Sequence, residues 1–600
     1  MIVLSTLAVL VGFVFAVPLA WRLTPRPHTA LEVALAGLGL SLGLLSLGVF
    51  ALGLACAGCV RLGSALALEA VVLALGLWLT RTAWAEVRWR VLPGRVWAWL
   101  REDLSRGGVV FLLLLGVGLI FLSNVYYPFR DFDALARYAY QARLIFEARG
   151  LPADLWGYPL LVPMNYAYAF LAFGGPVEWA AKLTPSVMAA GAVGAALALG
   201  RALLDEGAGY LSGLALLLTP IFGRWAMSGY VDVPVAFMVA MAALALYRWW
   251  QQQTAARAAW AGLWFGLALW TKQSALLQLA GTGAFVGLAL LDKGGWRERA
   301  RWLAIARDGL LMLGVALLVA GPWYARNYVL RGPSDIIVSP GAFATDRANP
   351  TLLNVLPFRV HPEQFGVGLS FVYWAGVVVT LVAALNVAPG ARRARDEVWG
   401  TRLLACLTVP HLLVWWQRYS YNPRHLLTML PLLAVMVGYT VRLGLGLLER
   451  RWRLATGTAL VLVLGLIWPA RLVPYVSAPY HLLLDPLGDI EARRSEALGD
   501  AYNIVNAIRE EATPGASIYT MDGRISFYLD GYEVRSGYPK HWRRLAEYDY
   551  LVATTKGSSV YETLEREDSE VLVGVASGDP RLQQVAHADD YTLFRVAIDE

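Results

Sequence analysis

Long apolar runs recur along the chain from near its N-terminus to about residue 475, separated by short polar segments. Runs of about 20 residues are long enough to cross the hydrocarbon core of a bilayer as helices. The pattern predicts an all-α polytopic membrane protein with about 14 transmembrane helices. We place these at residues 2–21, 33–55, 63–80, 108–126, 180–203, 208–226, 230–249, 256–271, 273–291, 309–326, 366–387, 403–418, 425–447 and 456–474.

The pattern changes after about residue 476, where the chain becomes polar and alternating. Three short runs with strand character are Ser517–Thr520, Tyr550–Thr554 and Tyr591–Val596. Helical patterns cover Ala501–Glu511 and Val560–Glu567. We therefore expect a small C-terminal α/β domain at 476–600. The expected order of domains is three additional N-terminal helices at 1–82, a basic loop at 83–107, a transmembrane core at 108–475, and this domain.

Basic residues indicate how the chain is oriented in the membrane. Arginine and lysine gather in alternate loops, and such loops stay in the cytoplasm. The basic segments are 81–107, 292–307, 389–402 and Arg450–Arg453. This places loops 127–179 and 327–365 and the C-terminal domain outside. The first apolar run lacks a preceding basic segment and is followed by Arg22, so we interpret it as an uncleaved span with its N-terminus outside.

Composition supports the membrane class and excludes some functions. The chain is 58% hydrophobic and only 16% charged, whereas soluble proteins carry about a quarter charged residues. The net charge of +7 is modest and follows the loop pattern, so it does not indicate nucleic-acid binding. Cys56 and Cys59 form a C-x-x-C motif without a second ligand pair, which argues against a zinc site. We interpret them as small residues at a helix end; the alternative is a disulfide on the exported side.

Two acidic motifs lie at the outer ends of spans. Asp131 and Asp133 follow a span and precede an amphipathic helix that carries Arg137 and Tyr138 and is expected to lie along the membrane interface. Asp232 opens a later span, two residues before a proline. Each of Asp133 and Asp232 could merely cap its helix. Capping does not require a second acid two residues earlier, and both motifs lie at the same depth, which favours a functional role.

Cations collect at the same outer ends: Lys272, Arg326, Arg418, Arg424 and, beside the last, His425. One such residue alone is more often a side chain that reaches the interface. Together these cations could form a seat for an anionic lipid head group.

The order and spacing of these motifs resemble those of the C-type superfamily of membrane glycosyltransferases. The match is to family 39, which includes protein O-mannosyltransferases and lipid A aminoarabinose transferases. The motifs that carry the resemblance are Asp131, Asp133, Arg137 and Tyr138; Asp232 and Pro234; and the segments Gly266–Lys272, Pro322–Asn327 and Arg424–Pro431. The resemblance covers about 108–475 and the C-terminal domain. Where aminoarabinose transferases have a Lys-Pro-Pro motif, this chain has Tyr158-Pro159 without lysine, which argues against aminoarabinose as the donor sugar.

The resemblance implies that a sugar moves from a polyprenyl-phosphate donor to an acceptor hydroxyl on a glycan, lipid or protein, with inversion, at the outer face of a bacterial-type inner membrane. Asp133 would be the general base, with Asp131 as its close competitor. Asp232 would orient the acceptor or Arg137. Residues expected to bind substrate or phosphate are Arg137, Tyr138, Lys272, Arg326, Arg424, His425, Tyr158 and Asn165. No cofactor is expected; some superfamily members use a divalent metal, but we favour a metal-free site.

Two other functions fit the same residues. A transporter or flippase for lipid-linked saccharides would bind a similar head group without chemistry, and a non-catalytic relative would act as a scaffold. Transporters place ionisable residues near the midplane of the membrane. In this chain only Glu69 and His411 lie well inside predicted spans, while acids and cations concentrate at one outer surface. The distribution favours the enzyme.

Overall fold

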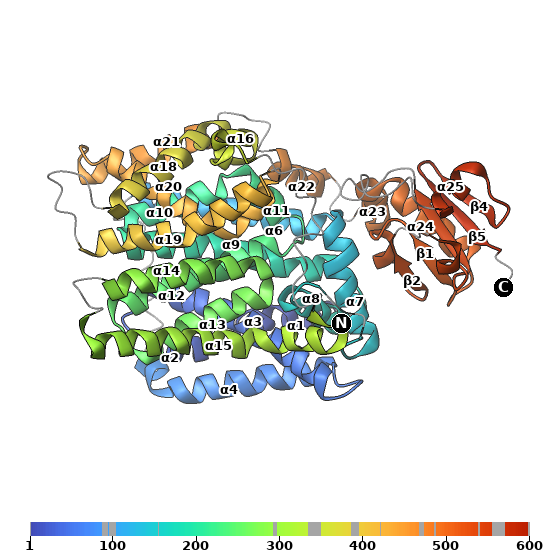
Figure 1. The fold of residues 1–600 in the computed structure, drawn as a ribbon, viewed down its shortest axis with the longest axis horizontal. Coiled ribbons are helices and arrows are strands. Elements are labelled where there is room, and N and C mark those ends of the chain that lie inside the picture. Colours follow the sequence, from blue (N-terminus) through green and yellow to red (C-terminus); the bar gives the residue numbers. More distant parts are fainter. Residues whose placement is uncertain are drawn as a thin grey trace.

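The computed structural model describes residues 2–86, 94, 104–153, 155, 157–291, 297–333, 350–385, 395–420, 422–466, 473–484, 488–537, 541–554 and 570–597. The predicted helix Val560–Glu567 and most of the predicted basic loop 83–107 lie outside these residues. The described chain forms a body of stacked helices with a small sheet domain at one end (Figure 1). The polytopic all-α fold with a C-terminal α/β domain is therefore confirmed.

Eleven segments among the described residues are long and apolar enough to cross a membrane. They contain α1 (Ile2–Gly12) with α2 (Val17–Leu23), α3 (Ala30–Ala55), α4 (Leu62–Glu86), α6 (Leu104–Tyr126), α9 (Glu178–Leu203), α12 (Asp232–Gln251), η3 (Gln273–Ala275) with α14 (Leu276–Leu291), α15 (Arg299–Arg331), α18 (Val367–Leu385), α19 (Arg395–Arg418), and η9 (Pro423–Met429) with α20 (Leu430–Gly444).

The other three predicted spans are helical but shorter, so the number 14 is not confirmed. The segment expected at 208–226 is broken into α10 (Glu206–Leu217) and α11 (Pro220–Ala226). The break fits Pro220, which disfavours a helical backbone at the residue before it. Helices α13 (Ala255–Thr271) and α21 (Arg450–Leu466) have 17 residues each.

The prediction for the first outer loop, 127–179, was incomplete. The expected helix is present as η2 (Ala134–Ala139), a π-helical turn, followed by α7 (Tyr140–Ala148). A second helix, α8 (Leu161–Phe173), follows it and is buried along almost its whole length between α3, α7 and α9. With 13 residues, α8 is too short to register as a span in a sequence.

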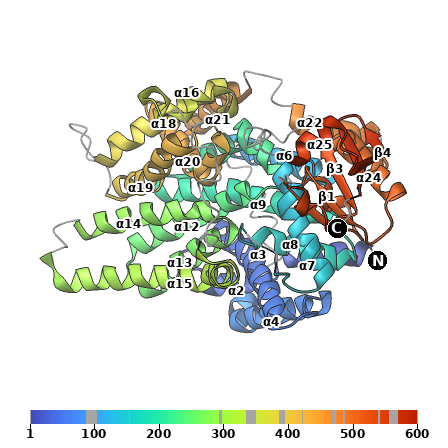
Figure 2. The same cartoon turned by 45° about the vertical axis from the view of Figure 1, so that its right-hand side comes forward.

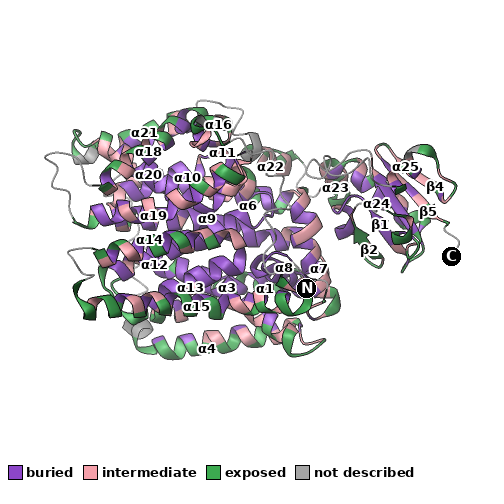
Figure 3. Cartoon of the chain, viewed as in Figure 1, coloured by how far each residue is buried: buried purple, intermediate pink, exposed green. Residues whose placement is uncertain are grey.

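The core of the body is centred on α12, whose span is 94% buried by packing on α9, α13 and η9. Figure 3 shows the gradient from this buried centre to the exposed α4 at the edge. The exposed side chains on α4 and α15 include large apolar residues such as Trp78 and Leu318. In a membrane protein such an apolar surface faces lipid.

The C-terminal domain is built from α23 (Ile490–Leu498), α24 (Asp500–Glu511) and α25 (Glu570–Ser577) around one sheet. Helix α22 (Val473–Leu484) connects it to the body. The strands are β1 (Ser517–Thr520), β2 (Glu533–Ser536), β3 (Tyr550–Thr554), β4 (Leu582–Ala588) and β5 (Tyr591–Val596), in the order β2-β1-β3-β5-β4. Strand β1 runs parallel to β2 and β3, whereas β5 is antiparallel to β3 and β4. The three predicted strands are β1, β3 and β5.

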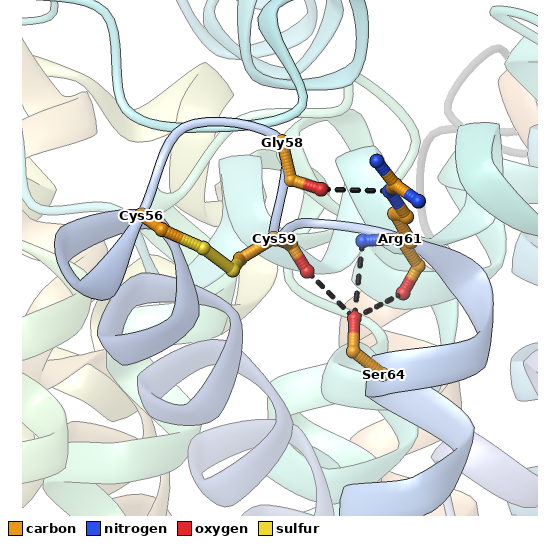
Figure 4. The surroundings of a disulfide bond; sticks show 5 residues. All are labelled: Cys56, Gly58, Cys59, Arg61 and Ser64. Atoms are coloured by element: carbon orange, nitrogen blue, oxygen red, sulfur yellow. Dashed lines mark hydrogen bonds between the residues drawn. A yellow bond between two sulfur atoms is a disulfide. The ribbon is translucent and has the colours of Figure 1, made fainter.

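Cys56 and Cys59 are joined by a disulfide in the turn between α3 and α4 (Figure 4). The favoured interpretation of two small residues at a helix end was therefore wrong, and the alternative pairing is present. The turn is tied to the end of α7, because the Val60 N–H donates to the Arg149 carbonyl oxygen at 3.0 Å. The N-terminal helices thus contact the element that follows the two acids.

Candidate functional site

The two acidic motifs and two of the predicted cations meet at the end of the body that faces the C-terminal domain. Asp133 immediately precedes η2, Asp232 is the first residue of α12, Lys272 follows the last residue of α13, and Arg424 lies in η9. Figure 2 shows the C-terminal domain beside α6, α7 and α8 at this end. Four elements that are distant in the sequence therefore contribute charged groups to one cluster.

Asp133 is the centre of the cluster. Its Oδ2 accepts a hydrogen bond from Nη1 of Arg424 at 3.0 Å, and its Oδ1 lies 3.3 Å from Nε of Arg137. Its N–H donates to the hydroxyl of Tyr230 at 2.9 Å. The described structure shows no capping hydrogen bond from the Asp133 side chain. The alternative that Asp133 only caps its helix is therefore wrong.

Asp232 forms a second, deeper ion pair. Its Oδ1 accepts from Nζ of Lys272 at 2.6 Å, and both side chains are almost completely buried. Lys272 reaches this position because α13 ends at Thr271, where the backbone turns to an extended conformation. The turn before Asp232 depends on Gly229, whose φ of 81° is unfavourable for other residues.

Aromatic rings enclose the guanidinium of Arg424. Its Cζ lies 5.1 Å from the ring centroids of both Trp225 and Tyr230. Such contacts stabilise a cation and restrict its orientation. Tyr138 packs edge-on against Tyr230 and Tyr158, with centroids 5.9 and 5.8 Å apart. The guanidinium of Arg137 lies 5.3 Å from the Tyr158 ring centroid.

The pKa of Tyr138 reports how close the charges are. Burial raises the pKa of its hydroxyl well above the ordinary value, and the negative charges of Asp133 and Asp232 raise it further, while Arg424 opposes them. The same three groups act on the hydroxyl of Tyr158, whose pKa is also raised, chiefly by burial. Groups from both ion pairs, Asp133–Arg424 and Asp232–Lys272, therefore act on the same two tyrosine hydroxyls.

Asp131 lies in the same segment but in a different charge environment. Burial raises the pKa of its carboxyl, and the nearby cations work against this rise. Those cations are Arg130, Lys182, Arg224 and Arg424. Asp131 and Asp133 therefore share Arg424 as a neighbour.

The remaining predicted residues lie around this cluster or away from it. His425 is buried, the charges of Lys272 and Arg424 act on its ring, and its carbonyl oxygen lies 2.9 Å from Nε2 of His411. Arg326 donates to the carbonyl oxygens of Leu155 and Pro152 at 2.8 and 2.6 Å, so it holds the segment that leads to Tyr158.

Asn165 and Arg418 do not join the cluster in the described contacts. The amide of Asn165 donates to the carbonyl oxygens of Leu42 and Leu161, which packs α8 on α3. No contact in the described structure brings Arg418, the last residue of α19, to Asp133 or Asp232. Of the cations that the sequence predicts to hold a head group together, Lys272 and Arg424 lie in the cluster, whereas Arg326 and Arg418 make no described contact with its aspartates.

Four residues at or beside the cluster were not predicted from the sequence: Tyr230, Trp225, Glu178 and Lys182. Lys182 donates from Nζ to the carbonyl oxygens of Tyr127 and Pro128 at 2.8 and 3.3 Å. Glu178 accepts from the Phe129 N–H at 2.7 Å. The signal available was an acid and a base four residues apart at the start of an apolar run, where a charge is costly unless it is paired.

The arrangement suits anion binding more than metal binding. Within the described ranges no group of three or more His, Cys, Asp or Glu residues is placed to hold a metal ion. The cations at and around the two outer acids are Arg130, Arg137, Lys182, Arg224, Lys272 and Arg424. Against these six cations stand three aspartates and Glu178, so the described cluster holds more basic than acidic groups.

Comparisons with known proteins bear on the fold and on one segment of the chain. Residues 158–323 match the family described as dolichyl-phosphate-mannose-protein mannosyltransferase, a range that contains Asp232 and Lys272 and begins after Asp133. No curated protein matches the chain.

Two similar solved structures are ArnT from Cupriavidus metallidurans bound to undecaprenyl phosphate and the same protein in the apo state. Both are 17% identical to this chain, with TM-scores of 0.55 and 0.54, and they cover 81% and 82% of it and 98% and 99% of their own chains. A third, the archaeal oligosaccharyltransferase AglB from Archaeoglobus fulgidus with an inhibitory peptide and dolichol-phosphate, is 12% identical over 76% of this chain and 70% of its own, with a TM-score of 0.49. The predicted resemblance to C-type membrane glycosyltransferases is confirmed for the fold and for the matched segment.

Proposed function

We propose that this protein transfers a sugar from a polyprenyl-phosphate donor to an acceptor hydroxyl at the outer face of a bacterial-type inner membrane, with inversion at the anomeric carbon. The observation that carries the proposal is the contact of Asp133 with both Arg137 and Arg424, beside the Asp232–Lys272 pair. A carboxylate paired with two arginines places a proton acceptor next to the cations that such a reaction needs.

The charge balance of the reaction explains the need for cations. The donor is a phosphodiester with one negative charge, and loss of the sugar leaves a phosphomonoester with a second, developing charge. Cations aimed at that phosphate stabilise the transition state more than the ground state. Arg424 and Arg137 suit this role because a guanidinium holds phosphate oxygens in two parallel hydrogen bonds.

Asp133 is the proposed general base. In the free protein its two oxygens engage Arg424 and Arg137. A donor phosphate that draws these arginines toward itself would release the carboxylate to accept the proton of the acceptor hydroxyl. The hydroxyl oxygen then bonds to the anomeric carbon as the bond from that carbon to the phosphate oxygen breaks. Asp131 remains the competing candidate, since it shares Arg424 as a neighbour.

Asp232 and Lys272 fit a supporting role. Their pair is buried, and the charge of Asp232 also acts on Arg424. In this role Asp232 helps to hold the guanidinium of Arg424 in place. No metal or cofactor takes part in the proposed reaction.

The test is transfer from synthetic polyprenyl-phosphate hexoses in membranes that hold the wild type, Asp133→Asn or Asp131→Asn, with a panel of glycan, lipid and peptide acceptors. Loss of a general base costs about 100- to 10,000-fold in rate, so Asp133→Asn should show that loss and Asp131→Asn a smaller one. Asp579→Asn is the matched control, because it makes the same chemical change at an aspartate that pairs with Arg581 on the C-terminal domain, without a described contact to the cluster.

The opposite ranking of the two aspartates would make Asp131 the base. Donor binding without turnover in the wild type, with every acceptor, would overturn the enzyme proposal in favour of a transporter.

A further inference from the structure

The segment that carries the two acids has no regular backbone of its own before η2. It runs from the end of α6 to Asp133, and buried charged groups at the start of α9 hold its backbone. Lys182 binds the carbonyl oxygens of Tyr127 and Pro128, and Glu178 binds the N–H of Phe129. Phe129 is two residues before Asp131, so these contacts fix the position of the backbone that leads to the two acids.

The C-terminal domain completes this arrangement from outside the body. Arg494 of α23 donates from Nε to Oε1 of Glu178 at 2.7 Å. The hydroxyl of Tyr528, in η11 (Ile525–Tyr528), lies 3.1 Å from Oε2 of Glu178 and 3.3 Å from the Phe129 carbonyl oxygen. Glu178 is 3% exposed, and the charge of Arg494 compensates its burial.

The same domain also forms hydrogen bonds with α7, the helix that follows the acids. Arg143 of α7 donates to the Phe527 carbonyl oxygen at 2.9 Å, and the Tyr140 hydroxyl donates to the Val534 carbonyl oxygen at 3.2 Å. Gly523 lies so close to η2 that a Cβ there would approach the Ala136 Cβ to 3.0 Å. The C-terminal domain therefore contacts the acid-bearing segment on both sides of Asp131 and Asp133.

We propose that the C-terminal domain positions the catalytic acids, and that Arg494 and Tyr528 are the positioning residues that act through Glu178. The inference rests on the proposed function, because it assigns a role in that reaction. Their described contacts with the acid-bearing segment go to Glu178 and to the Phe129 backbone, not to the acids themselves. They hold the Phe129 backbone, and a displacement of about 1 Å at a reacting group costs on the order of 100-fold in rate.

The first test separates positioning from substrate binding. Arg494→Met, Arg494→Lys and Tyr528→Phe are compared with wild type for transfer from a polyprenyl-phosphate hexose. Arg494→Met should lower kcat about 10- to 100-fold and change the KM for the donor less than about threefold, because the phosphate-binding residues remain in place. Arg494→Lys keeps the charge and should recover part of the rate, and Tyr528→Phe should lose less than Arg494→Met.

The matched control is Arg581→Met. Arg581 pairs with Asp579 on the same domain, without a described contact to the body. It should keep the wild-type kcat. A wild-type kcat in Arg494→Met, or a loss confined to KM, would overturn the proposal.

The second test needs no activity. Hydrogen exchange of the backbone amides in residues 127–139 is measured in the full-length protein in lipid nanodiscs. Arg494→Met should speed exchange in this segment at least about tenfold and leave β3 and β5 unchanged, whereas Arg581→Met should leave the segment protected. Unchanged exchange in Arg494→Met would overturn the positioning role alone. If Arg494→Met exchanges faster but the wild-type protein transfers no sugar, the proposed function is overturned, while the contact between domain and segment stands.

Discussion

The two ion pairs of the site are built in opposite ways. Asp232 and Lys272 come from the ends of α12 and α13, two helices packed along their length, and their side chains are 1% and 7% exposed. Asp133 and its partners come from an irregular segment, η2 and η9, and the side chain of Arg137 is 30% exposed. The first pair is a fixed part of the packed body. In the second cluster Arg137 reaches solvent, whereas the side chains of Asp133 and Arg424 are 12% and 14% exposed.

From this difference we expect substitutions in the Asp232–Lys272 pair mainly to lower stability, and substitutions among Asp133 and its partners mainly to lower activity. A buried charge that loses its partner destabilises the fold, because the lost solvation is no longer compensated. A partly exposed charge such as that of Arg137 keeps more of its solvation, so its loss costs less stability and mainly affects what it binds. Substitutions at the two pairs therefore should give different combinations of melting temperature and rate.

The largest expected effect on stability is that of Lys272→Met. It leaves the carboxylate of Asp232 buried without its cation, which costs about 3–5 kcal/mol of unfolding free energy. Thermal unfolding in detergent should show a lower midpoint. The double variant Lys272→Met/Asp232→Asn should recover most of the loss, because the unpaired charge is gone. If Lys272→Met is as stable as wild type, then water solvates the carboxylate of Asp232 after the cation is removed.

Arg424→Lys tests the pair of Arg424 with Asp133. Lysine keeps the charge but cannot stack between Trp225 and Tyr230 or present a fork to both Asp133 and a phosphate. We expect kcat/KM for the lipid-linked donor to fall about 10- to 100-fold, which is about 1.4–2.7 kcal/mol of transition-state stabilisation. The melting midpoint should change little. Retention of more than half of the wild-type kcat/KM would remove Arg424 from the phosphate-binding role.

Gly229→Ala strains the link between the two pairs. Gly229 has a φ of 81°, and a Cβ there would lie 2.6 Å from the Phe129 ring. The left-handed backbone alone costs roughly 1–2 kcal/mol for a residue with a side chain. The variant should unfold at lower temperature, and its kcat should fall because Phe129 precedes the acids. Gly175→Ala is the control, because the space around that position is open; equal behaviour of the two variants would contradict the argument.

The smallest effect is a pH dependence at Asp131. Burial raises the pKa of its folded carboxyl above the unfolded value of about 3.9. The associated stability is complete below the unfolded pKa and is lost as pH rises through the folded pKa. Asp131→Asn should therefore unfold at a higher temperature than wild type at pH 7, with a difference that shrinks toward pH 4. A variant less stable than wild type at pH 7 would mean that the cations around Asp131 outweigh its burial.

Much of the fold followed from local patterns. Apolar length and basic loops gave a membrane body, and alternation gave β1, β3 and β5, because each signal depends on neighbouring residues only. Helix α8 was missed since its 13 apolar residues look like part of a loop. The break between α10 and α11 was missed because the apolar run continues through Pro220.

The site was predicted as a set of residues but not as a set of contacts. Asp133, Asp232, Lys272 and Arg424 were found because a charge next to an apolar run is rare. Arg326 and Asn165 are polar groups beside apolar runs as well. Arg326, however, donates to a backbone carbonyl oxygen of the segment that leads to Tyr158, and Asn165 of α8 donates to one in α3. A sequence shows that a polar group needs a partner but does not show which partner it finds.

By itself, the amino-acid sequence determined that the chain crosses a membrane, that its C-terminal part forms an α/β domain, and that acids and cations gather at the ends of helices. These properties follow from the free energy of transferring each segment into lipid or water. Only the tertiary structure decided that Arg424 pairs with Asp133, 291 residues away, and that Arg494 reaches Glu178 from another domain. Such pairings depend on how helices pack side by side, which no local pattern of residues encodes.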